Sequence, residues 1–204
     1  LNHTGPADEH AALYAALIGF LDDPSVKVRA ALAYGLMHSL DAPRPIMLAL
    51  LHDSAVIARA VLQYSPVLID ADLIGLIRTL DIAMLTSISQ RTRVSPRLAA
   101  ALMARKDPQL TVRLLRRHDI ALAETLLTGL TQDHGDDAGM RGALLARPDL
   151  PAAARLLLVG KVSDALRETR LVKGALTSER LGRVLRDSGD TALTAIGERE
   201  AGRS

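Results

Sequence analysis

The sequence predicts an all-α protein built as an α-solenoid of antiparallel helix pairs, and three observations lead to this prediction. The 204 residues are 49% hydrophobic but only 2% aromatic, so the core consists of small aliphatic side chains, which suit packed helices better than a β-sandwich. No segment has the alternating pattern of a strand. Finally, a unit of Asp, five residues and Arg recurs within apolar helical runs, as in stacked helical repeats.

The repeated unit is clearest in the run LDDPSVKVRAAL, and each copy is expected to open a helix. Its copies are Asp23 to Arg29, Asp53 to Arg59, Asp107 to Arg113 and Asp149 to Arg155. Asp is a strong N-cap, because its carboxylate accepts hydrogen bonds from the free N–H groups of the first turn. A Pro follows Asp23 and Asp107 directly, at the first helical position, where its missing N–H is not needed.

The Arg of each unit is expected to lie at a seam between helices. Six residues correspond to about 240° around a helix, so the Asp and Arg of one helix point to different sides. Arg29 lies among apolar residues, where a charge needs a partner. The N-cap Asp of the neighbouring repeat would supply it, which predicts a structural ladder of alternating Asp and Arg. The alternative is four coincidental pairs in an Arg-rich chain.

In chain order, each expected helix follows a capping signal or an apolar run. The expected ranges are 7–21, 24–39, 46–51, 70 or 72 to 79, 81–90, 96–106, 107–117, 120–132, a segment from 140, 150–159, 162–176, 178–186 and 191–196. Asp81 is interpreted as a degenerate marker, with Ser87 where Arg would stand, so that the markers from Asp23 to Asp107 recur every 26 to 30 residues, before a gap of 42 residues to Asp149. One domain over 1–204 is expected, clearest over 21–176 and ending in a weaker cap over 177–204.

Composition and hydropathy exclude several classes of protein. Without cysteine, disulfides and Cys-ligated metal sites are excluded, and nothing indicates secretion. The net charge of +2 is far from that of a nucleic-acid-binding tail. The apolar run Ala11–Leu21 is too short to span a bilayer and follows acidic residues rather than Lys or Arg. A soluble, cytoplasmic protein is expected, with no membrane partner.

Two segments carry a resemblance to a known family. SPVLIDADLIGLIRT (65–79) and ARPDLPAAARLLLVGKVSDALRE (146–168) resemble a HEAT-like family of unknown function common in alphaproteobacteria. The resemblance extends over about residues 20–176 and implies an α-solenoid. The family has no established catalytic residues to carry over. The short units and Ser87 depart from the HEAT pattern.

Candidate catalytic and metal sites are weak. His52-Asp53 and His118-Asp119 match the central pair of helical metal-dependent phosphohydrolases, which need a further His and Asp on the same metal. His38 and His134 are the candidates, but Asp53 is already explained as a helix cap, and Asp119 could equally cap the helix expected from Ile120. The loop DHGDD (133–137) lacks the ordered ligand spacing of a calcium site. No metal and no cofactor are expected, and enzymatic activity is disfavoured.

Nucleic-acid binding is the main alternative to a protein-binding function. Some HEAT-like proteins are DNA glycosylases, and this chain has a basic cluster around residues 113–118, with further Arg and Lys residues over 91–106. Base recognition would also use aromatic platforms, which are scarce here. We therefore predict a non-catalytic scaffold or adaptor that binds another protein, with a DNA-repair-like solenoid second and a phosphohydrolase third.

The predicted binding face follows from the repeat register. Tyr34, Tyr64 and His118 each stand five positions after a marker Arg, so stacking would place them in one row. Lys27 shares a stripe with Tyr34 and His38, at spacings of seven and four. Tyr is a natural contact residue, because it has a rigid apolar body and a polar tip. The alternative is that these rings fill gaps between neighbouring helices.

Overall fold

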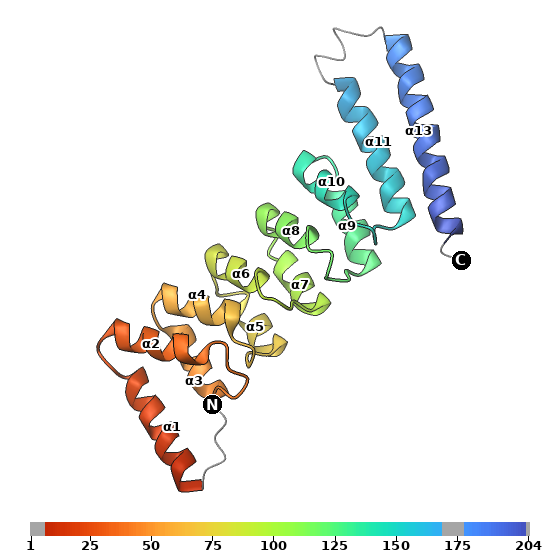
Figure 1. The fold of residues 1–204 in the computed structure, drawn as a ribbon. Coiled ribbons are helices and arrows are strands. Elements are labelled where there is room, and N and C mark those ends of the chain that lie inside the picture. The colour runs from red at the N-terminus through yellow and green to blue at the C-terminus, as the bar shows by residue number, and fades with distance from the viewer. Residues whose placement is uncertain (1–6, 169–177, 203–204) are drawn as a thin grey trace. The chain divides into compact units, whose positions relative to one another are not determined.

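The computed structural model describes residues 7–168 and 178–202, and in these residues the protein consists of twelve α-helices, one 3-10 helix and no strand (Figure 1). The all-α prediction is thus confirmed. The chain divides into two compact units, one up to Leu110 and one from Thr111, so that the boundary falls within α8 (Pro108–Leu115).

The first unit packs its helices in two sets. Its elements are α1 (Ala7–Leu21), α2 (Val26–Leu36), α3 (Arg44–Ala49), the 3-10 helix η1 (Leu50–His52), α4 (Ala55–Tyr64), α5 (Asp70–Leu76), α6 (Ile82–Ser89) and α7 (Pro96–Met103). In one set α4 packs against both α2 and α6, and in the other α1 contacts α3 and α5 contacts α7. Helices alternate between the two sets along the chain, so each connection crosses from one set to the other.

Aliphatic side chains form the core of the first unit, as the composition predicts. Met47, Leu50, Val61, Leu85 and Leu98 are all fully buried. Among the residues for which burial is described, no Phe or Tyr is buried. Small aliphatic side chains allow short helices to approach closely, which brings the ends of neighbouring helices into contact.

The second unit contains the rest of α8 together with α9 (Glu124–His134), α10 (Ala138–Leu145), α11 (Ala152–Glu168) and α13 (Ser178–Ala201). Helices α9, α10 and α11 all contact one another, and α11 also packs against α13. The sequence predicted a break within each of the last two helices. Both predictions are wrong for the described residues: α11 continues through Gly160, whose surroundings are open, and α13 is a single helix.

Polar caps fix several helix starts as predicted. Asp81 accepts a hydrogen bond from the Met84 N–H at 2.8 Å, and Ser95 accepts one from the Leu98 N–H at 3.0 Å. Asp107 caps α8 in the same way, with its Oδ1 atom 2.7 Å from the N–H nitrogen of Leu110. These side chains satisfy N–H groups that have no partner within the helix.

Other predicted caps are wrong. The residue at the N-cap of α2 is Ser25, and Asp23 instead accepts from the Ser25 N–H at 2.7 Å. Ser54 occupies the N-cap of α4, one residue after Asp53. Asp149 lies three residues before α11 begins. A carboxylate can hold a turn that precedes a helix as well as the helix itself, so an Asp does not by itself fix the first residue.

Helix α9 begins four residues later than predicted, at Glu124 rather than Ile120. In the preceding segment residues 118–120 form a turn and a bend, residues 121–123 have no regular structure, and Ile120 and Leu122 are buried. The carbonyl oxygen of Ile120 accepts a hydrogen bond of 2.7 Å from Arg147. This bond satisfies a backbone carbonyl group that has no partner within a helix.

Gly135, at the end of α9, offers a direct test of the packing of α9 against α11. A Cβ atom there would lie 2.5 Å from the carbonyl oxygen of Thr131 and 2.6 Å from Cδ of Lys161 in α11. We expect Gly135→Ala to lower the free energy of unfolding by about 1–3 kcal/mol, because the added methyl group overpacks this contact. Denaturant titration measures the change.

The matched control lies in the same helix. A Cβ atom on Gly129 would meet no atom within 4 Å. Gly129→Ala should therefore raise stability by about 0.5–1 kcal/mol, since Ala is the better helix former. Equal effects of the two substitutions would show that α9 and α11 do not pack as described.

Candidate binding groove

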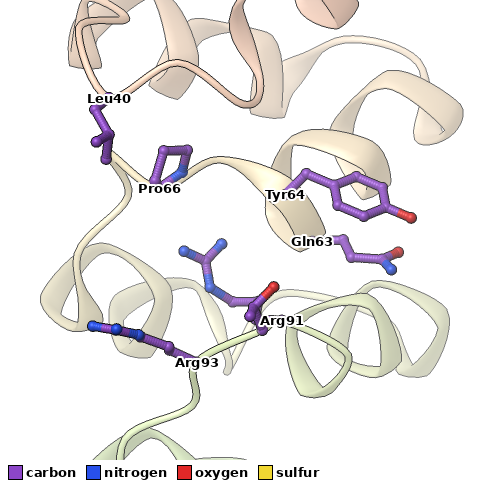
Figure 2. Close-up of a pocket in the computed structure, with 7 residues that line it drawn as sticks. Leu40, Gln63, Tyr64, Pro66, Arg91 and Arg93 are labelled. Carbon is purple, nitrogen blue, oxygen red and sulfur yellow. The ribbon is translucent and has the colours of Figure 1, made fainter.

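A groove of about 500 Å³ lies in the first unit, where the ends of three helices meet (Figure 2). It is lined by Leu40, Gln63, Tyr64, Pro66, Arg91, Thr92 and Arg93. These residues come from the segment after α2, from the end of α4 and the turn beyond it, and from the segment after α6. Since α4 packs against both α2 and α6, it is this packing that brings the three segments together.

Apolar side chains form one part of the groove. Leu40 is 79% exposed and Tyr64 is 46% exposed, although both are large and hydrophobic. The Tyr64 ring lies 5.2 Å from the ring of His38, centroid to centroid, at a tilt of 56°. The Tyr64 ring thus contacts the His38 ring while almost half of the residue remains exposed.

Arg91 holds the groove together. Its guanidinium donates hydrogen bonds to the carbonyl oxygens of Leu62 and Ser65, both at 2.7 Å, and of Leu68 at 3.4 Å. Burial lowers the pKa of Arg91 below its ordinary value, and the charge of Asp70 opposes that effect. Carbonyl groups at the end of a helix lack partners within it, so one buried Arg ties α4 and its following turn to the end of α6.

Arg93 is a different kind of group, although it stands two residues away. Its side chain is exposed, and it makes no hydrogen bond or ion pair within the described residues. Its charge is therefore not compensated locally. Figure 2 shows Arg91 pointing toward Pro66, whereas Arg93 extends along the lower left of the groove.

The residues predicted for a binding face are exposed, but only Tyr64 lines the groove. Tyr34 is 59% exposed, and Lys27 and His118 are also exposed. Exposure alone does not decide the alternative that these rings fill gaps between neighbouring helices, because neither ring is buried but the Tyr64 ring contacts His38, which follows α2. His118 belongs to the second unit, so its place beside the two Tyr residues stays a prediction.

The first step of the predicted Asp–Arg ladder is present in the structure. Arg29 donates from Nε to Asp53 Oδ2 at 2.6 Å and from Nη2 to Asp53 Oδ1 at 3.1 Å. A further bond of 2.7 Å joins Arg29 Nη1 to the carbonyl oxygen of Asp23. This bidentate pair connects α2 to the start of α4.

The later steps of the ladder differ from the prediction. Arg59 and Arg113 are exposed, because each lies on the outward side of its helix rather than at a seam, and neither has an ion pair in the described part of the chain. Asp149 pairs with Arg147 instead, at 2.6 Å. Arg155 donates to the carbonyl oxygens of Leu145 and Arg147.

The arginines that join the end of one helix to the end of the helix two before it in the chain were not predicted from the sequence. Arg105 donates to the carbonyl oxygens of Ile77 and Leu80, much as Arg91 does to those after α4. Arg147 donates to the carbonyl oxygens of Leu115, Arg117 and Ile120. We call Arg91, Arg105 and Arg147 the carbonyl-capping arginines. Each follows a buried Ile or Leu by three residues and stands just after the end of its helix, a register that the sequence does contain.

The Arg29–Asp53 pair predicts a specific dependence of stability on pH. The hydrogen bond from Arg29 lowers the pKa of Asp53 below its ordinary value, although burial opposes the shift. Asp53 should therefore stabilise the fold fully above about pH 4 and lose this contribution as the pH falls through its lowered pKa. Thermal melting from neutral to acidic pH should show Asp53→Asn less stable at neutral pH, with the gap to the wild type closing in acid.

The control for this pH dependence is Asp22→Asn. Asp22 is exposed, and its carboxylate has no hydrogen bond in the described residues. Its substitution should leave the pH profile parallel to that of the wild type. A gap for Asp53→Asn that stays constant down to the lowest pH would contradict the role assigned to the ion pair.

The candidate metal residues do not converge in the described part of the chain. His52 and His118 are exposed, and no group of three His, Asp or Glu residues there could hold a metal ion. Within the loop DHGDD, Asp136 pairs with Lys161 at 2.6 Å and Asp137 caps α10. Two of the three acidic residues of this loop, Asp136 and Asp137, therefore have structural roles. None of the helices described in the structure has the length and apolar content needed to cross a membrane.

Comparison with known proteins places the chain in a family. The family described as an uncharacterised protein conserved in bacteria, DUF2336, matches residues 57–204, well over half of the chain. The chain belongs to this family. The match includes every lining residue of the groove except Leu40. No curated protein and no solved structure matches the chain.

Proposed function

We propose that this DUF2336 protein is a non-catalytic binding scaffold, and that its helices form a HEAT-like solenoid that presents the groove to another protein. The observation that carries the proposal is a groove lined by two exposed apolar side chains, Leu40 and Tyr64, and by Arg93, which has no ion pair among the described residues. Contiguous exposed apolar patches often mark contact sites, and aromatic residues and Arg are enriched in protein interfaces.

The rigidity of the groove supports the same function. Arg91 fixes the backbone of the groove through three carbonyl oxygens, so little order has to be gained when a partner binds. The alternating packing of α1 to α7 supports the HEAT-like arrangement, because in such stacks each helix pair contacts its neighbours.

Affinity capture with the full chain tests the scaffold. Protein partners retained from a bacterial lysate and identified by mass spectrometry should be weakened by Tyr64→Ala, since Tyr is an efficient contact residue. Tyr14→Ala is the matched control, because Tyr14 is also exposed but lies on α1, outside the groove. If both variants retain the protein partners equally, the groove is not the contact site.

Tyr34→Ala belongs in the same experiment. Tyr34 stands in α2 at the repeat position that Tyr64 occupies in α4, and it is exposed without lining the groove. A loss of retention similar to that of Tyr64→Ala would extend the contact surface along α2. Unchanged retention would confine it to the groove.

Nucleic-acid binding is the second candidate, supported by the exposure of Arg113, Arg116 and His118. The neighbouring Arg117 pairs with Asp119, which reduces the local positive charge. Fluorescence anisotropy with a labelled DNA duplex at two salt concentrations tests this candidate. Binding that weakens steeply with salt, and that Arg113→Ala with Arg116→Ala abolishes, would favour it over the scaffold.

A further inference from the structure

We propose that the groove binds an acidic peptide segment, in which a carboxylate pairs with Arg93 and a neighbouring apolar side chain packs against Leu40 and Tyr64. This inference rests on the proposed scaffold function and names the chemistry of its partner. It follows from the charge, the shape and the hydrogen-bonding groups of the groove.

The charge of the groove is positive. Its described lining contains Arg91 and Arg93 and no acidic residue. Asp70, the carboxylate that acts on Arg91, accepts a hydrogen bond from the hydroxyl of Ser95. Arg91 donates to backbone carbonyl oxygens, so Arg93 is the cation available to a ligand. A guanidinium offers two parallel N–H donors, the geometry that a carboxylate matches.

The walls of the groove favour an aliphatic or aromatic side chain beside that carboxylate. Leu40 and Pro66 are exposed aliphatic groups, and Tyr64 adds an exposed ring. A volume of about 500 Å³ is in the range of sites that hold small molecules, so it accommodates a few side chains. The ligand is therefore amphipathic, with a charged group and an apolar group close together along its chain.

Gln63 supplies the polar contact that a peptide backbone needs. It is partly exposed, lines the groove, and makes no hydrogen bond within the described residues. Its amide can donate to one peptide carbonyl and accept from one peptide N–H. This pairing orients an extended chain across the groove without requiring a particular side chain.

The same features argue against single-stranded nucleic acid in this groove. A phosphate backbone is bound by several cations, and its bases stack on open aromatic faces. Here one arginine is available, and the Tyr64 ring is already in contact with His38. A peptide with one or two carboxylates therefore fits the groove better than a polyanion.

The test is selection of random dodecapeptides, displayed on phage, against the immobilised full chain. Selected peptides should be enriched in Asp or Glu next to Leu, Ile or Phe. In anisotropy titrations with the labelled selected peptide, Arg93→Glu should weaken binding at least about ten-fold, because a charge-assisted hydrogen bond is replaced by repulsion. Selection against Arg93→Glu should enrich basic peptides instead.

The matched control is Arg78→Glu. Arg78 is exposed, has no partner within the described residues and does not line the groove. It should keep the preference for acidic peptides and the affinity of the wild type. Arg93→Gln, which removes the charge without reversing it, should bind with intermediate affinity, and thermal melting should show all three variants folded.

The possible results separate this inference from the function on which it rests. The selected peptides could be neutral or basic, and their binding could depend on Tyr64 but not on Arg93. This result would contradict the inference of an acidic ligand but not the proposed scaffold function. No enrichment over a Tyr64→Ala, Leu40→Ala double variant would overturn both. Displacement of the selected peptide by oligo-dT at equal concentration would overturn the choice of a peptide over nucleic acid.

Discussion

Replacing Arg147 with Ala should lower the free energy of unfolding by about 3–5 kcal/mol, because it removes the donor at the centre of a buried network. The side chain of Arg147 is fully buried, and it donates to three backbone carbonyl oxygens and to both carboxylate oxygens of Asp149. Truncation leaves the buried carbonyl oxygens of Leu115 and Ile120 without their donor, and it removes the ion-pair partner of the more exposed Asp149. Denaturant titration of the full chain measures the loss.

Two further variants show whether the stabilisation by Arg147 depends on its hydrogen bonds or on its charge alone. Arg147→Lys keeps the charge but cannot donate to the carbonyl oxygens of both Leu115 and Ile120 while pairing with Asp149, so it should recover only part of the stability. Arg113→Ala, at an exposed site of the same unit, should change stability by less than about 0.5 kcal/mol. Equal effects at residues 147 and 113 would contradict the buried network.

Local signals in the sequence were sufficient to predict where many of the helices begin. The predicted range of α1 agrees with the structure at both ends, and α6 and α7 begin after the predicted caps Asp81 and Ser95. These starts depend on hydrogen bonds between residues three apart, which the sequence displays directly. The start of α9 was missed because the segment before it is held outside the helix by a residue of another segment, Arg147, which donates to the carbonyl oxygen of Ile120.

The ladder was predicted from spacing, and spacing does not tell which side of a helix reaches a neighbour. Arg29 and Arg59 occupy the same position of the repeat, yet Arg29 reaches Asp53 while Arg59 is exposed. The carbonyl-capping arginines have a different register, just beyond the end of a helix. Their partners are backbone atoms, which every residue has, so no pair of residue types in the sequence points to them.

The groove illustrates the same limit for a functional site. Tyr64 was singled out because it shares a repeat position with Tyr34, and it does line the groove. Leu40 and the role of Arg93 could not be predicted, since these residues line one groove with Tyr64 only through the packing of α4 against α2 and α6. A site made from three separate segments has no local pattern in the sequence.

The second large effect is expected at Arg91, and its neighbour Arg93 provides the contrast. Arg91→Ala should lower the free energy of unfolding by about 2–4 kcal/mol, because it leaves partly buried carbonyl oxygens of Leu62, Ser65 and Leu68 without a charged donor. Arg93→Ala should change stability by less than about 0.5 kcal/mol, since that side chain is exposed and has no partner among the described residues. Denaturant titration and peptide anisotropy on the same two proteins separate the roles.

The affinity for the selected acidic peptide should show the opposite order of effects. Among folded proteins, Arg93→Ala should reduce this affinity more than Arg91→Ala does. At a temperature where both variants are folded, Arg93→Ala should lose affinity for the selected acidic peptide, because it removes the cation available to the carboxylate. Arg91→Ala should retain part of the affinity, since its guanidinium is directed to the backbone. An Arg91→Ala protein as stable as the wild type, or an Arg93→Ala protein that binds as the wild type does, would mean that the two arginines have been assigned the wrong roles.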